Sequence, residues 1–529
     1  MNLVRTFSVI LSIGVLLYPE VGSQTVLGSH CGDLRVRLSN AFTNSLLSFF
    51  VSKKNDDSLP RPPYNFMNEA RILTSRELKS DNSQVLKGMF SWHQVGNDIN
   101  GEAPDDWSGY SVDISSDGNR VIIGADWNDG NGVKSGHARI FEEVNGTDWK
   151  QVGNDIDGEA SGDRAGGSVG ISSDGKRVIV GSYNNNGNGK HSGHARVFEE
   201  VDGRWGQLGE DIDGENAEDW SGESVDMSAD GKRVIVGARF NDSNGDKSGH
   251  ARVFQEIDGA WVQVGHDITG EEYDDKSGSV VSMSSDGKRV IVGAYANGGN
   301  GSNSGHARVF SEVDGVWLQI GDDIDGENAG DESGTSVDIS ADGKRVILGA
   351  PLNDGSGMVS SGHARVYEEN DGKWIQVGND IDGEAPDDRS GFSVSMSDNG
   401  KLVIIGAFNN DGNGDRSGHA RVFVEVGKIW SQLGDDINGE KAGDISGSAV
   451  AMSSNGERVI IGAMFNDGNG TDSGHSRVFD LSDPSLEPNA FPSSVPSSSP
   501  SQAPSADAPK TSTFISFFIV CVLLASDIL

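Results

Sequence analysis

Hydrophobic and polar residues follow one recurring order through the middle of the chain. In residues 221–268 this order predicts four short β-strands, because each segment alternates or is rich in β-branched residues. The segments are SGESVDMS (221–228), RVIVGA (233–238), HARVFQEI (250–257) and WVQVGHDI (261–268). Asp-Gly turns separate the first strand from the second and the third from the fourth. The pattern therefore predicts a unit of four antiparallel strands.

This unit recurs every 56 or 57 residues, and a tryptophan at the start of the fourth strand marks each copy. The tryptophans are Trp92, Trp149, Trp205, Trp261, Trp317, Trp374 and Trp430. A fixed period of this length indicates a repeat architecture. Seven four-stranded antiparallel units arranged radially predict an all-β fold, a seven-bladed β-propeller.

The two ends of the repeat region are incomplete in complementary ways. The last copy of the third strand, in SGHSRVF, is followed by DLSDPSLEP and has no fourth strand after it. An additional WHQVGNDI at residues 92–99 precedes the first complete unit. We therefore expect this N-terminal strand to complete the last blade, built otherwise from residues 446–480, and so to remove an exposed sheet edge.

The repeat, SGxSVxxSxDGxRVIVGAxxNDGNGxxSGHARVF, resembles the FG-GAP repeats of integrin α-subunit propellers and their bacterial and algal relatives. GFSV stands at residues 391–394, and GAP occurs in full at Gly349–Pro351. The resemblance covers residues 92–480 and implies a seven-bladed propeller that recognises partners with one face. Integrin-type Ca²⁺ loops precede the second strand, where this chain has only SxDGK. The calcium ligands of that family therefore have no counterpart at this position.

One end of the predicted blades collects most of the acidic residues. The loops from the second to the third strand, and from the fourth strand to the next blade, are long and rich in Asn, Gly and Asp. Two of the former loops place oxygen-bearing side chains at i, i+2 and i+4, a spacing typical of Ca²⁺ loops. These residues are Asp242, Asn244 and Asp246, and Asp411, Asn413 and Asp415. We predict weak Ca²⁺ binding there, and the alternative is solvated Asn-Gly turns.

The loops that lead to the next blade repeat an acidic motif, DIDGE. Its acids either share the cations or cap the backbone N–H groups of the loop. The sets are Asp155, Asp157 and Glu159; Asp211, Asp213 and Glu215; Asp323, Asp325 and Glu327; and Asp380, Asp382 and Glu384.

Each third strand begins with a histidine and carries an arginine two residues later, on the same face of the strand. A catalytic histidine is expected once, so we interpret the repeated one as a packing and hydrogen-bonding group inside the ring. The histidines are His137, His194, His250, His306, His363, His419 and His475. We expect each arginine to form a bidentate pair with an acid. The arginines are Arg139, Arg196, Arg252, Arg308, Arg365, Arg421 and Arg477.

An enzyme needs a set of catalytic groups that breaks the sevenfold pattern. On the first strands Asp113, Asp226 and Asp338 do so, because other blades carry Gly, Ser or Ala there. Carboxylates facing the axial channel would suit glycosidase-type chemistry, but these three stand blades apart. We therefore predict a binding protein rather than an enzyme, with an enzyme acting on polysaccharide as the least favoured alternative.

The partner class follows from charge and from aromatic residues. With 42 Lys and Arg against 80 Asp and Glu, the net charge of −38 excludes nucleic acid. We expect recognition of an extracellular or cell-surface protein through the acidic loops. The alternative is a lectin-type propeller whose ligand is a glycan bound by aromatic stacking. Trp107, Trp127 and Trp220 lie in these loops but not in every blade, which argues against a sevenfold sugar site.

The two ends of the chain indicate export and tethering at the outer face of the plasma membrane. Residues 1–23 read as a signal peptide, or alternatively as an uncleaved signal anchor. Residues 24–91 remain unassigned, and 481–513 form a Ser/Pro-rich stalk. The hydrophobic tail 514–529 reads as a GPI signal, with Ser505, Ala506 or Asp507 as the attachment residue, or as a short membrane anchor.

Two further features suit the secretory route. Cys521 lies in the tail, which leaves Cys31 alone and excludes an intramolecular disulfide framework. Four sequons predict N-glycosylation at Asn145, Asn241, Asn300 and Asn469.

Overall fold

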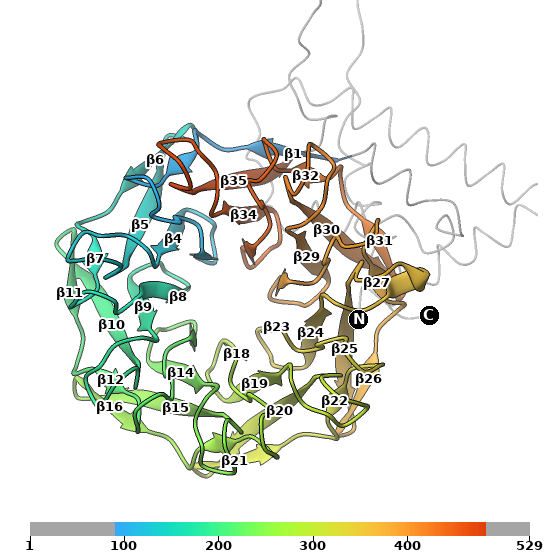
Figure 1. The fold of residues 1–529 in the computed structure, drawn as a ribbon, viewed down its shortest axis with the longest axis horizontal. Coiled ribbons are helices and arrows are strands. Elements are labelled where there is room, and N and C mark those ends of the chain that lie inside the picture. Colours follow the sequence, from blue (N-terminus) through green and yellow to red (C-terminus); the bar gives the residue numbers. More distant parts are fainter. Residues whose placement is uncertain (1–89, 483–529) are drawn as a thin grey trace, which may run out of the picture. The chain divides into compact units, whose positions relative to one another are not determined.

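Seven antiparallel sheets stand radially around a central channel (Figure 1). The structure is a computed structural model, and it describes residues 90–482. The prediction of an all-β, seven-bladed β-propeller is confirmed. Besides its strands, the described part has one short 3₁₀ helix, η1 (Gly355–Gly357), and none of its helices is long and apolar enough to cross a membrane. The predicted signal peptide, stalk and hydrophobic tail lie outside the described residues.

Blade 3 shows the plan of every sheet. From the channel outward its strands are β13 (Ser224–Met227), β14 (Arg233–Ala238), β15 (His250–Ile257) and β16 (Ala260–Gln263). The predicted second and third strands coincide with β14 and β15. The predicted fourth strand is divided, because Gly265 adopts a φ of 73° and bends the chain. Beyond this bend β17 (Ile268–Thr269) pairs separately with β15.

The other blades repeat this plan. Blade 1 comprises β3 (Ser111–Ile114), β4 (Arg120–Ala125), β5 (His137–Val144), β6 (Asp148–Gln151) and β7 (Ile156–Asp157). Blade 2 comprises β8 (Ala165–Ile171), β9 (Arg177–Ser182), β10 (His194–Val201), β11 (Arg204–Gln207) and β12 (Ile212–Asp213). Blade 4 comprises β18 (Val280–Met283), β19 (Arg289–Ala294), β20 (His306–Val313), β21 (Val316–Gln319) and β22 (Ile324–Asp325).

The last three blades follow in chain order. Blade 5 comprises β23 (Ser336–Ile339), β24 (Arg345–Ala350), β25 (His363–Asn370), β26 (Lys373–Gln376) and β27 (Ile381–Asp382). Blade 6 comprises β28 (Ser393–Met396), β29 (Leu402–Ala407), β30 (His419–Val426), β31 (Ile429–Gln432) and β32 (Ile437–Asn438). Blade 7 comprises β33 (Ala449–Met452), β34 (Arg458–Ala463), β35 (His475–Ser482) and the N-terminal strands β1 (Ser91–Gln94) and β2 (Ile99–Asn100).

The N-terminal strands close the ring, as the sequence predicts. β1 pairs antiparallel with β35, and Trp92 lies opposite Leu481 in this pairing. β2 pairs with the beginning of the same strand. The outer position of blade 7 is therefore filled from the other end of the repeat region, and the two ends are held together by a continuous ladder.

The hydrophobic core lies in the seams between neighbouring blades. The second strand of each blade is apolar on both faces, so each face packs against a different neighbour. In blade 1, Val121 and Ile123 pack toward blade 7, whereas Ile122 packs toward blade 2. All three are at most 1% exposed. A blade therefore buries its core only when it stands between two others.

Each seam is also crossed by a tryptophan hydrogen bond. The indole Nε1 of Trp261 donates to the backbone oxygen of Leu208 in the preceding blade, at 2.8 Å. The equivalent bonds of the other blades have lengths of 2.8–2.9 Å and join Trp149 to Val95, Trp205 to Val152, Trp317 to Val264, Trp374 to Ile320, Trp430 to Val377 and Trp92 to Leu433. The repeating tryptophan is thus a connector between blades, and Trp92 makes the closing connection.

At one end of the channel, backbone hydrogen bonds join the turns between first and second strands into an unbroken circle. Ser116 N donates to Ser173 O, and each turn donates to the next until Ser454 N donates back to Ser116 O. We call this end the short-turn face. The opposite end, formed by the long loops, is called the long-loop face.

Salt bridges run around the same end of the seams, with one exception. Arg120 pairs with Glu200 of the next blade at 2.6 Å, and Arg345 pairs with Glu425 in the same way. Between blades 6 and 7 both charges are replaced. Leu402 stands where the other blades carry arginine, and it shares a hydrophobic cluster with Leu481. An apolar pair therefore replaces the ion pair at this one seam.

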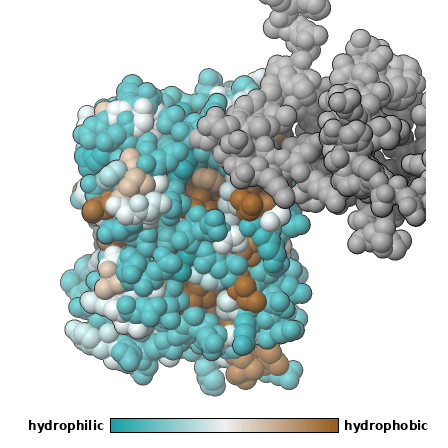
Figure 2. Space-filling view, turned by 90° about the vertical axis from the view of Figure 1, so that its right-hand side faces the viewer, coloured by the Kyte–Doolittle hydropathy of each residue, from teal (hydrophilic) through white to brown (hydrophobic). Residues whose placement is uncertain are grey.

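The outer rim is mainly hydrophilic, with apolar patches where the outermost strands expose single side chains (Figure 2). The exposed apolar residues of these strands include Val316, Leu318, Ile375 and Ile429.

Removing the closing strand should abolish cooperative unfolding. Deletion of residues 92–99 removes most of the outer strands of blade 7 together with the Trp92 hydrogen bond. The seams on both sides of blade 7 then expose apolar side chains to water. We expect urea unfolding, followed by tryptophan fluorescence, to become broad and to shift to lower denaturant. His93→Ala, an exposed change in the same strand, should unfold like the wild type. A deleted protein with the wild-type transition would contradict the role of closure.

The leucine pair predicts a coupled response at the seam between blades 6 and 7. Leu402→Arg alone and Leu481→Glu alone each place an unpaired charge in an apolar contact, and each should lower the free energy of unfolding by about 1–3 kcal/mol. The double variant rebuilds the ion pair of the other seams. Denaturant titration should show that the free energy of unfolding falls less in the double variant than the sum of the falls in the two single variants. The difference should be about 0.5–1 kcal/mol. Strict additivity would contradict the equivalence of the two pairs.

Candidate functional site

The long-loop face is built from two loops per blade that hold each other. In blade 3 these are residues 239–249, between β14 and β15, and residues 270–279, which lead into blade 4. The Nδ2 of Asn244 donates to the backbone oxygens of Gly270 and Glu271, each at 2.9 Å. Gly249 and Ser277 form a parallel bridge close by. The loops that the sequence predicts to be the binding face are thus ordered by each other.

The residues predicted to bind Ca²⁺ take part in this loop structure. Asp242 Oδ1 accepts the backbone N–H of Lys247 at 2.8 Å, and Asp411 Oδ1 accepts that of Arg416 at the same distance. Asn413 donates across the loops in the same way as Asn244. Asp246 and Asp415 have exposed side chains, and their backbone oxygens accept hydrogen bonds from the neighbouring loop. Ca²⁺ binding at these loops stays a prediction.

A buried Asn–Asp pair, which the sequence analysis did not single out, joins the loop between the second and third strands to the loop that leads into the same blade, in blades 2–7. Asn241 is 0% exposed, and its Nδ2 donates to Asp219 Oδ2 at 2.9 Å. Asp219 also accepts the backbone N–H of Asn216. The same pairing joins Asn185 to Asp163, Asn297 to Asp275, Asn353 to Asp331, Asn410 to Asp388 and Asn466 to Asp444. The regular recurrence of both residues was the signal available in the sequence.

The sequons differ in what their side chains do. Asn145 is exposed in the turn between β5 and β6. Asn241 is the buried anchor just described. The amide nitrogens of Asn300 and Asn469 donate across the loops to the backbone oxygens of Gly326 and Gly101. A glycan at Asn145 would displace no protein contact of this kind, and glycosylation of all four remains a prediction.

The repeated histidines lie in the seams, each beside two carboxylates. The Nδ1 of His250 lies 3.7 Å from Asp267 of its own blade and 3.9 Å from Glu215 of the loop that leads in from the preceding blade. Burial, and then the charge of Arg252, lower the pKa of His250 to about 4, so its ring is neutral at neutral pH. We call each such group of His, Asp and Glu a seam cluster.

The donor atoms of the following seam clusters all lie within 4.8 Å of one another. They are Asp98, Glu440 and His475; Glu102, His137 and Asp155; Glu159, His194 and Asp211; Glu215, His250 and Asp267; and Glu271, His306 and Asp323. The remaining two blades carry Glu327, His363 and Asp380, and Glu384, His419 and Asp436, at the same positions of the repeat.

The acidic motif DIDGE is therefore shared between two seams. Asp155 joins the cluster of its own blade with His137, whereas Glu159 joins that of the next blade with His194. The sequence analysis treated the acids of one motif as a set. The structure separates them, because the loop crosses a seam between the two residues.

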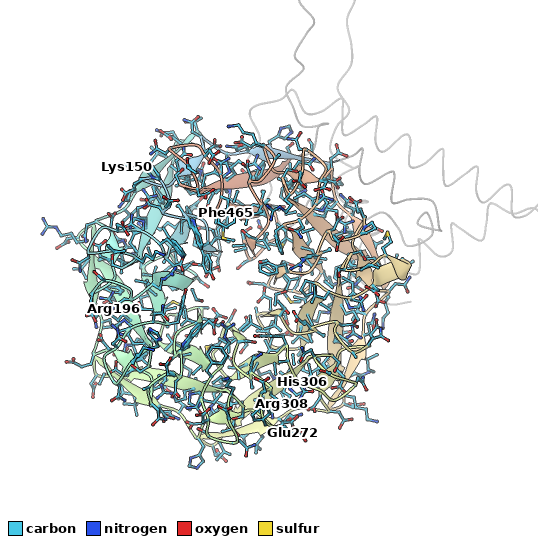
Figure 3. All side chains as sticks on the ribbon, in the orientation of Figure 1. Lys150, Arg196, Glu272, His306, Arg308 and Phe465 are labelled. Carbon is cyan, nitrogen blue, oxygen red and sulfur yellow. The ribbon has the colours of Figure 1, made fainter. Side chains whose placement is uncertain are left out.

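The repeated arginines differ from the expected bidentate pairing with acids. Arg252 donates from Nη2 to the backbone oxygen of Asp213 in the preceding blade at 2.6 Å, while its Nη1 lies 3.8 Å from Glu215. Asp213 ends the two-residue strand β12, so its oxygen has no further strand to bond to. The main interaction of each arginine is thus a hydrogen bond to a backbone carbonyl, and its ion pair with glutamate is longer. His306 and Arg308 lie on one strand, β20, in the same arrangement (Figure 3).

Aromatic and basic side chains break the sevenfold symmetry of the long-loop face. Trp107 stacks on Trp127 with ring centroids 3.9 Å apart, and Phe465 of blade 7 meets Trp107 edge-on at 5.1 Å. Lys134 Nζ lies 3.3 Å from the Trp127 ring and Arg164 lies 4.4 Å from it. Figure 3 places Phe465 close to the inner edge of the ring.

A second group of this kind continues into blades 2 and 3. Trp220 contacts Tyr183 and Phe240, with centroids 5.5 and 4.8 Å away, and Arg239 lies over both Trp220 and Phe240. We call the two groups together the aromatic arc. Its tryptophans are half-buried, and they are the three that the sequence analysis assigned to this face.

The three exceptional aspartates line the axial cavity, as the sequence predicts, at its short-turn end. The cavity has a volume of about 140 Å³ and is lined by Asp113, Asp226 and Asp338 together with turn residues such as Ser116 and Ser454. Burial, and then the neighbouring Asp226, raise the pKa of Asp113 to about 8, and burial with Asp338 raises that of Asp226 to about 7.

The oxygens of these aspartates are used to connect blades. Asp113 accepts the backbone N–H of Ile114 with Oδ1 and that of Ile171, in blade 2, with Oδ2, both at 2.8 Å. Ser282 Oγ lies 3.0 Å from both Asp226 and Asp338. The carboxylates of alternate blades thus hold the first strand of the next blade.

Comparison with known proteins supports the repeat assignment. Residues 100–141, 213–254 and 381–423 match the FG-GAP repeat family. These matches confirm FG-GAP repeats at three places in the seven-bladed propeller. No curated protein matches the chain.

Two solved structures are similar to the chain at low sequence identity. Hydrazine synthase of Kuenenia stuttgartiensis is 13% identical, with 70% of this chain and 94% of that chain covered and a TM-score of 0.45. A "putative 6-phosphogluconolactonase" from Bacteroides uniformis is 14% identical, with 64% and 88% covered and a TM-score of 0.45.

The raised pKa of Asp113 predicts that stability falls as pH rises from about 4 to 8. The folded protein holds a proton on this carboxyl up to about pH 8, whereas the unfolded chain releases it near pH 4. Between these two pH values the unfolded chain has lost a proton that the folded protein keeps, so raising the pH favours unfolding. In Asp113→Asn, thermal unfolding followed by circular dichroism should depend less on pH over this range, although one acceptor is lost. Asp213→Asn, an exposed change, should keep the wild-type slope, and an equal slope in all three proteins would contradict the assignment.

Proposed function

We propose that this protein is an extracellular binding protein of the cell surface, which recognises a partner protein through its long-loop face. The FG-GAP β-propeller is a ligand-binding scaffold in general. The observation that carries the proposal is the aromatic arc, because it gathers the three tryptophans of this acidic face, whereas the other blades carry at most smaller groups such as Phe392 and Phe408. Partly buried aromatic and arginine side chains are the residues that most often anchor protein interfaces.

The location at the cell surface rests on the two ends of the chain. The signal-peptide pattern of residues 1–23, the Ser/Pro-rich stretch 481–513 and the hydrophobic tail 514–529 supply the argument for export and tethering. A stalk of this length would hold the propeller away from the membrane and leave the long-loop face accessible.

A binding role also fits the axial carboxylates better than catalysis does. Both oxygens of Asp113 accept backbone hydrogen bonds, and Ser282 bridges Asp226 and Asp338. A carboxylate with both oxygens committed to the backbone is a connector between strands. A general acid or a nucleophile must instead present an oxygen to the substrate.

Calcium would assist binding through the loops that contain Asp242 and Asp411. Their exposed acidic neighbours, Asp246 and Asp415, lie on the same face as the aromatic arc. A cation there would reduce the repulsion that the net charge of −38 imposes on an approaching acidic partner.

A lectin-type function is the second candidate, and the stacked pair Trp107 and Trp127 favours it. Aromatic rings combined with hydrogen-bonding loops suit the apolar faces and hydroxyls of a sugar. The repeated loops would add avidity if the glycan itself repeats.

Binding of the soluble fragment 24–505 to its own cells tests the proposal. We expect binding that a chelator of Ca²⁺ weakens about tenfold, the equivalent of about 1.4 kcal/mol. The double variant Asp411→Asn with Asp415→Asn should lose part of that affinity, because it disables one of the two loops. Asn at 411 keeps an acceptor for the Arg416 N–H but removes the charge. Trp127→Ala should weaken binding with or without the chelator.

Controls separate these effects from misfolding and from glycan binding. Asp258→Asn, which changes an exposed turn of the short-turn face, should bind like the wild type. Protease-treated cells that still bind, together with a positive glycan array, would replace the protein partner by a glycan. Absence of binding to cells and glycans alike would contradict both candidates.

A further inference from the structure

We propose that the seam clusters bind divalent first-row transition-metal ions, for which Zn²⁺ is the test ion. Each cluster offers one imidazole nitrogen and two carboxylate oxygens from separate parts of the fold. Zn²⁺ accepts this mixed set, whereas Ca²⁺ and Mg²⁺ prefer oxygen ligands alone. The site is distinct from the predicted calcium loops, which hold neither the histidine nor either carboxylate of a cluster.

Each carboxylate of a cluster is held by one oxygen and directs the other toward the histidine. Asp267 Oδ1 accepts a hydrogen bond from Gln263 at 2.8 Å, and its Oδ2 lies 3.7 Å from His250 Nδ1. Glu215 Oε1 lies 3.8 Å from Arg252, and its Oε2 lies 3.9 Å from the same nitrogen. Partners of this kind orient metal ligands in known sites.

The spacing of the donor atoms suits a metal better than a direct hydrogen bond. A nitrogen and an oxygen 3.7–3.9 Å apart are beyond hydrogen-bonding distance. Two ligands about 2.1 Å from a tetrahedral Zn²⁺ lie about 3.4 Å apart. A closure of a few tenths of an ångström, within reach of flexible Asp and Glu side chains, would complete the coordination.

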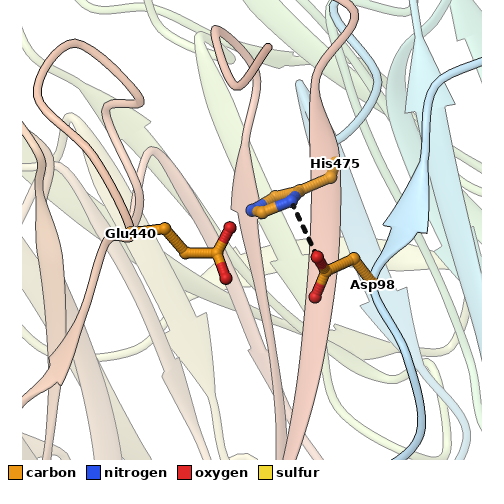
Figure 4. Close-up of side chains that lie close together, drawn as sticks. All are labelled: Asp98, Glu440 and His475. Atoms are coloured by element: carbon orange, nitrogen blue, oxygen red, sulfur yellow. Dashed lines mark ion pairs between the residues drawn. The ribbon is translucent and has the colours of Figure 1, made fainter. Parts of the chain in front are cut away.

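Three of the histidines supply an independent argument, because they are buried polar groups without hydrogen-bond partners. His250 is 0% exposed, and His137 and His475 are 1% exposed. Neither ring nitrogen of these three has a hydrogen-bond partner. Such orphaned groups are rare in native proteins and call for a ligand. Figure 4 shows the ring of His475 lying between the carboxylates of Glu440 and Asp98.

The charge and exposure of the clusters also suit a cation. Two carboxylates and one arginine leave a net charge of −1 beside a neutral imidazole. The Glu215 and Asp267 side chains are 38% and 26% exposed, so an ion can enter from solvent past the acids and reach the buried histidine. Three protein ligands leave further coordination positions to water.

At the closing seam the ion would join three segments far apart in the sequence. Asp98 belongs to the N-terminal strands, Glu440 to the loop leaving blade 6 and His475 to β35 of blade 7. Metal binding would therefore stabilise the closure of the ring as well as the other seams.

Metal content of single-cluster variants tests this proposal. The full chain, stripped with a chelator and then dialysed against Zn²⁺, should bind about one ion per blade more tightly than its scattered surface acids do. Asp267→Asn and Glu215→Gln each disable one cluster of seven, so each should bind one ion fewer by elemental analysis. Asp213→Asn removes an exposed acid of the same loop that belongs to no cluster, and it should keep the wild-type number.

Circular dichroism shows whether each variant is folded, and Glu215→Gln is the change least able to disturb folding because its side chain is the more exposed. Equal Zn²⁺ content in the wild type and both cluster variants would overturn the proposal. Absence of bound Zn²⁺ would do so as well. Displacement of Zn²⁺ from the clusters by an equal concentration of Ca²⁺ would overturn the assignment to a transition metal.

Discussion

The structure depends on the closing of every seam between blades. The second strand of each blade is apolar on both faces, and a single blade can cover neither. The same contacts therefore recur at each boundary: an indole hydrogen bond to a carbonyl, an arginine donor to another carbonyl, and a backbone bond between neighbouring turns. A ring of such contacts has no free end only if its first strand returns to its last blade, which is what β1 does by pairing with β35.

The alternation of apolar and polar side chains predicts the strands correctly where the backbone stays extended over the whole segment. Residues 233–238 and 250–257 became β14 and β15 without adjustment, because β-branched residues in these segments fill two seams at once. The fourth strand was predicted as one segment because its alternation continues through residues 261–268. Gly265 interrupts it with a positive φ, and alternation of side chains carries no information about that bend.

The candidate site was harder to predict, because its residues are neighbours in the sequence but not in space. Asp155 and Glu159 stand four positions apart, yet they face different histidines in two neighbouring seams. The arginines show the same limit. Their regular position predicted a structural role, but the choice of a carbonyl over a carboxylate depends on β12 ending at an open edge. Only the three-dimensional arrangement of the strands decides such partners.

On the long-loop face the buried contacts repeat from blade to blade, whereas the outward-facing residues vary. The buried Asn–Asp pairs and the loop-to-loop hydrogen bonds are the same from blade to blade, and they fix the path of the loops. Residues that point outward from this frame can then differ without cost to folding. Blades 7, 1, 2 and 3 use that freedom to carry the aromatic arc, whereas blade 4 has Ala296 and blade 5 has Leu352 at the position of Trp127. Blade 6 carries a smaller aromatic pair, Phe392 and Phe408. A symmetric scaffold thereby presents surfaces that differ from one side of the ring to the other, which a single partner can distinguish.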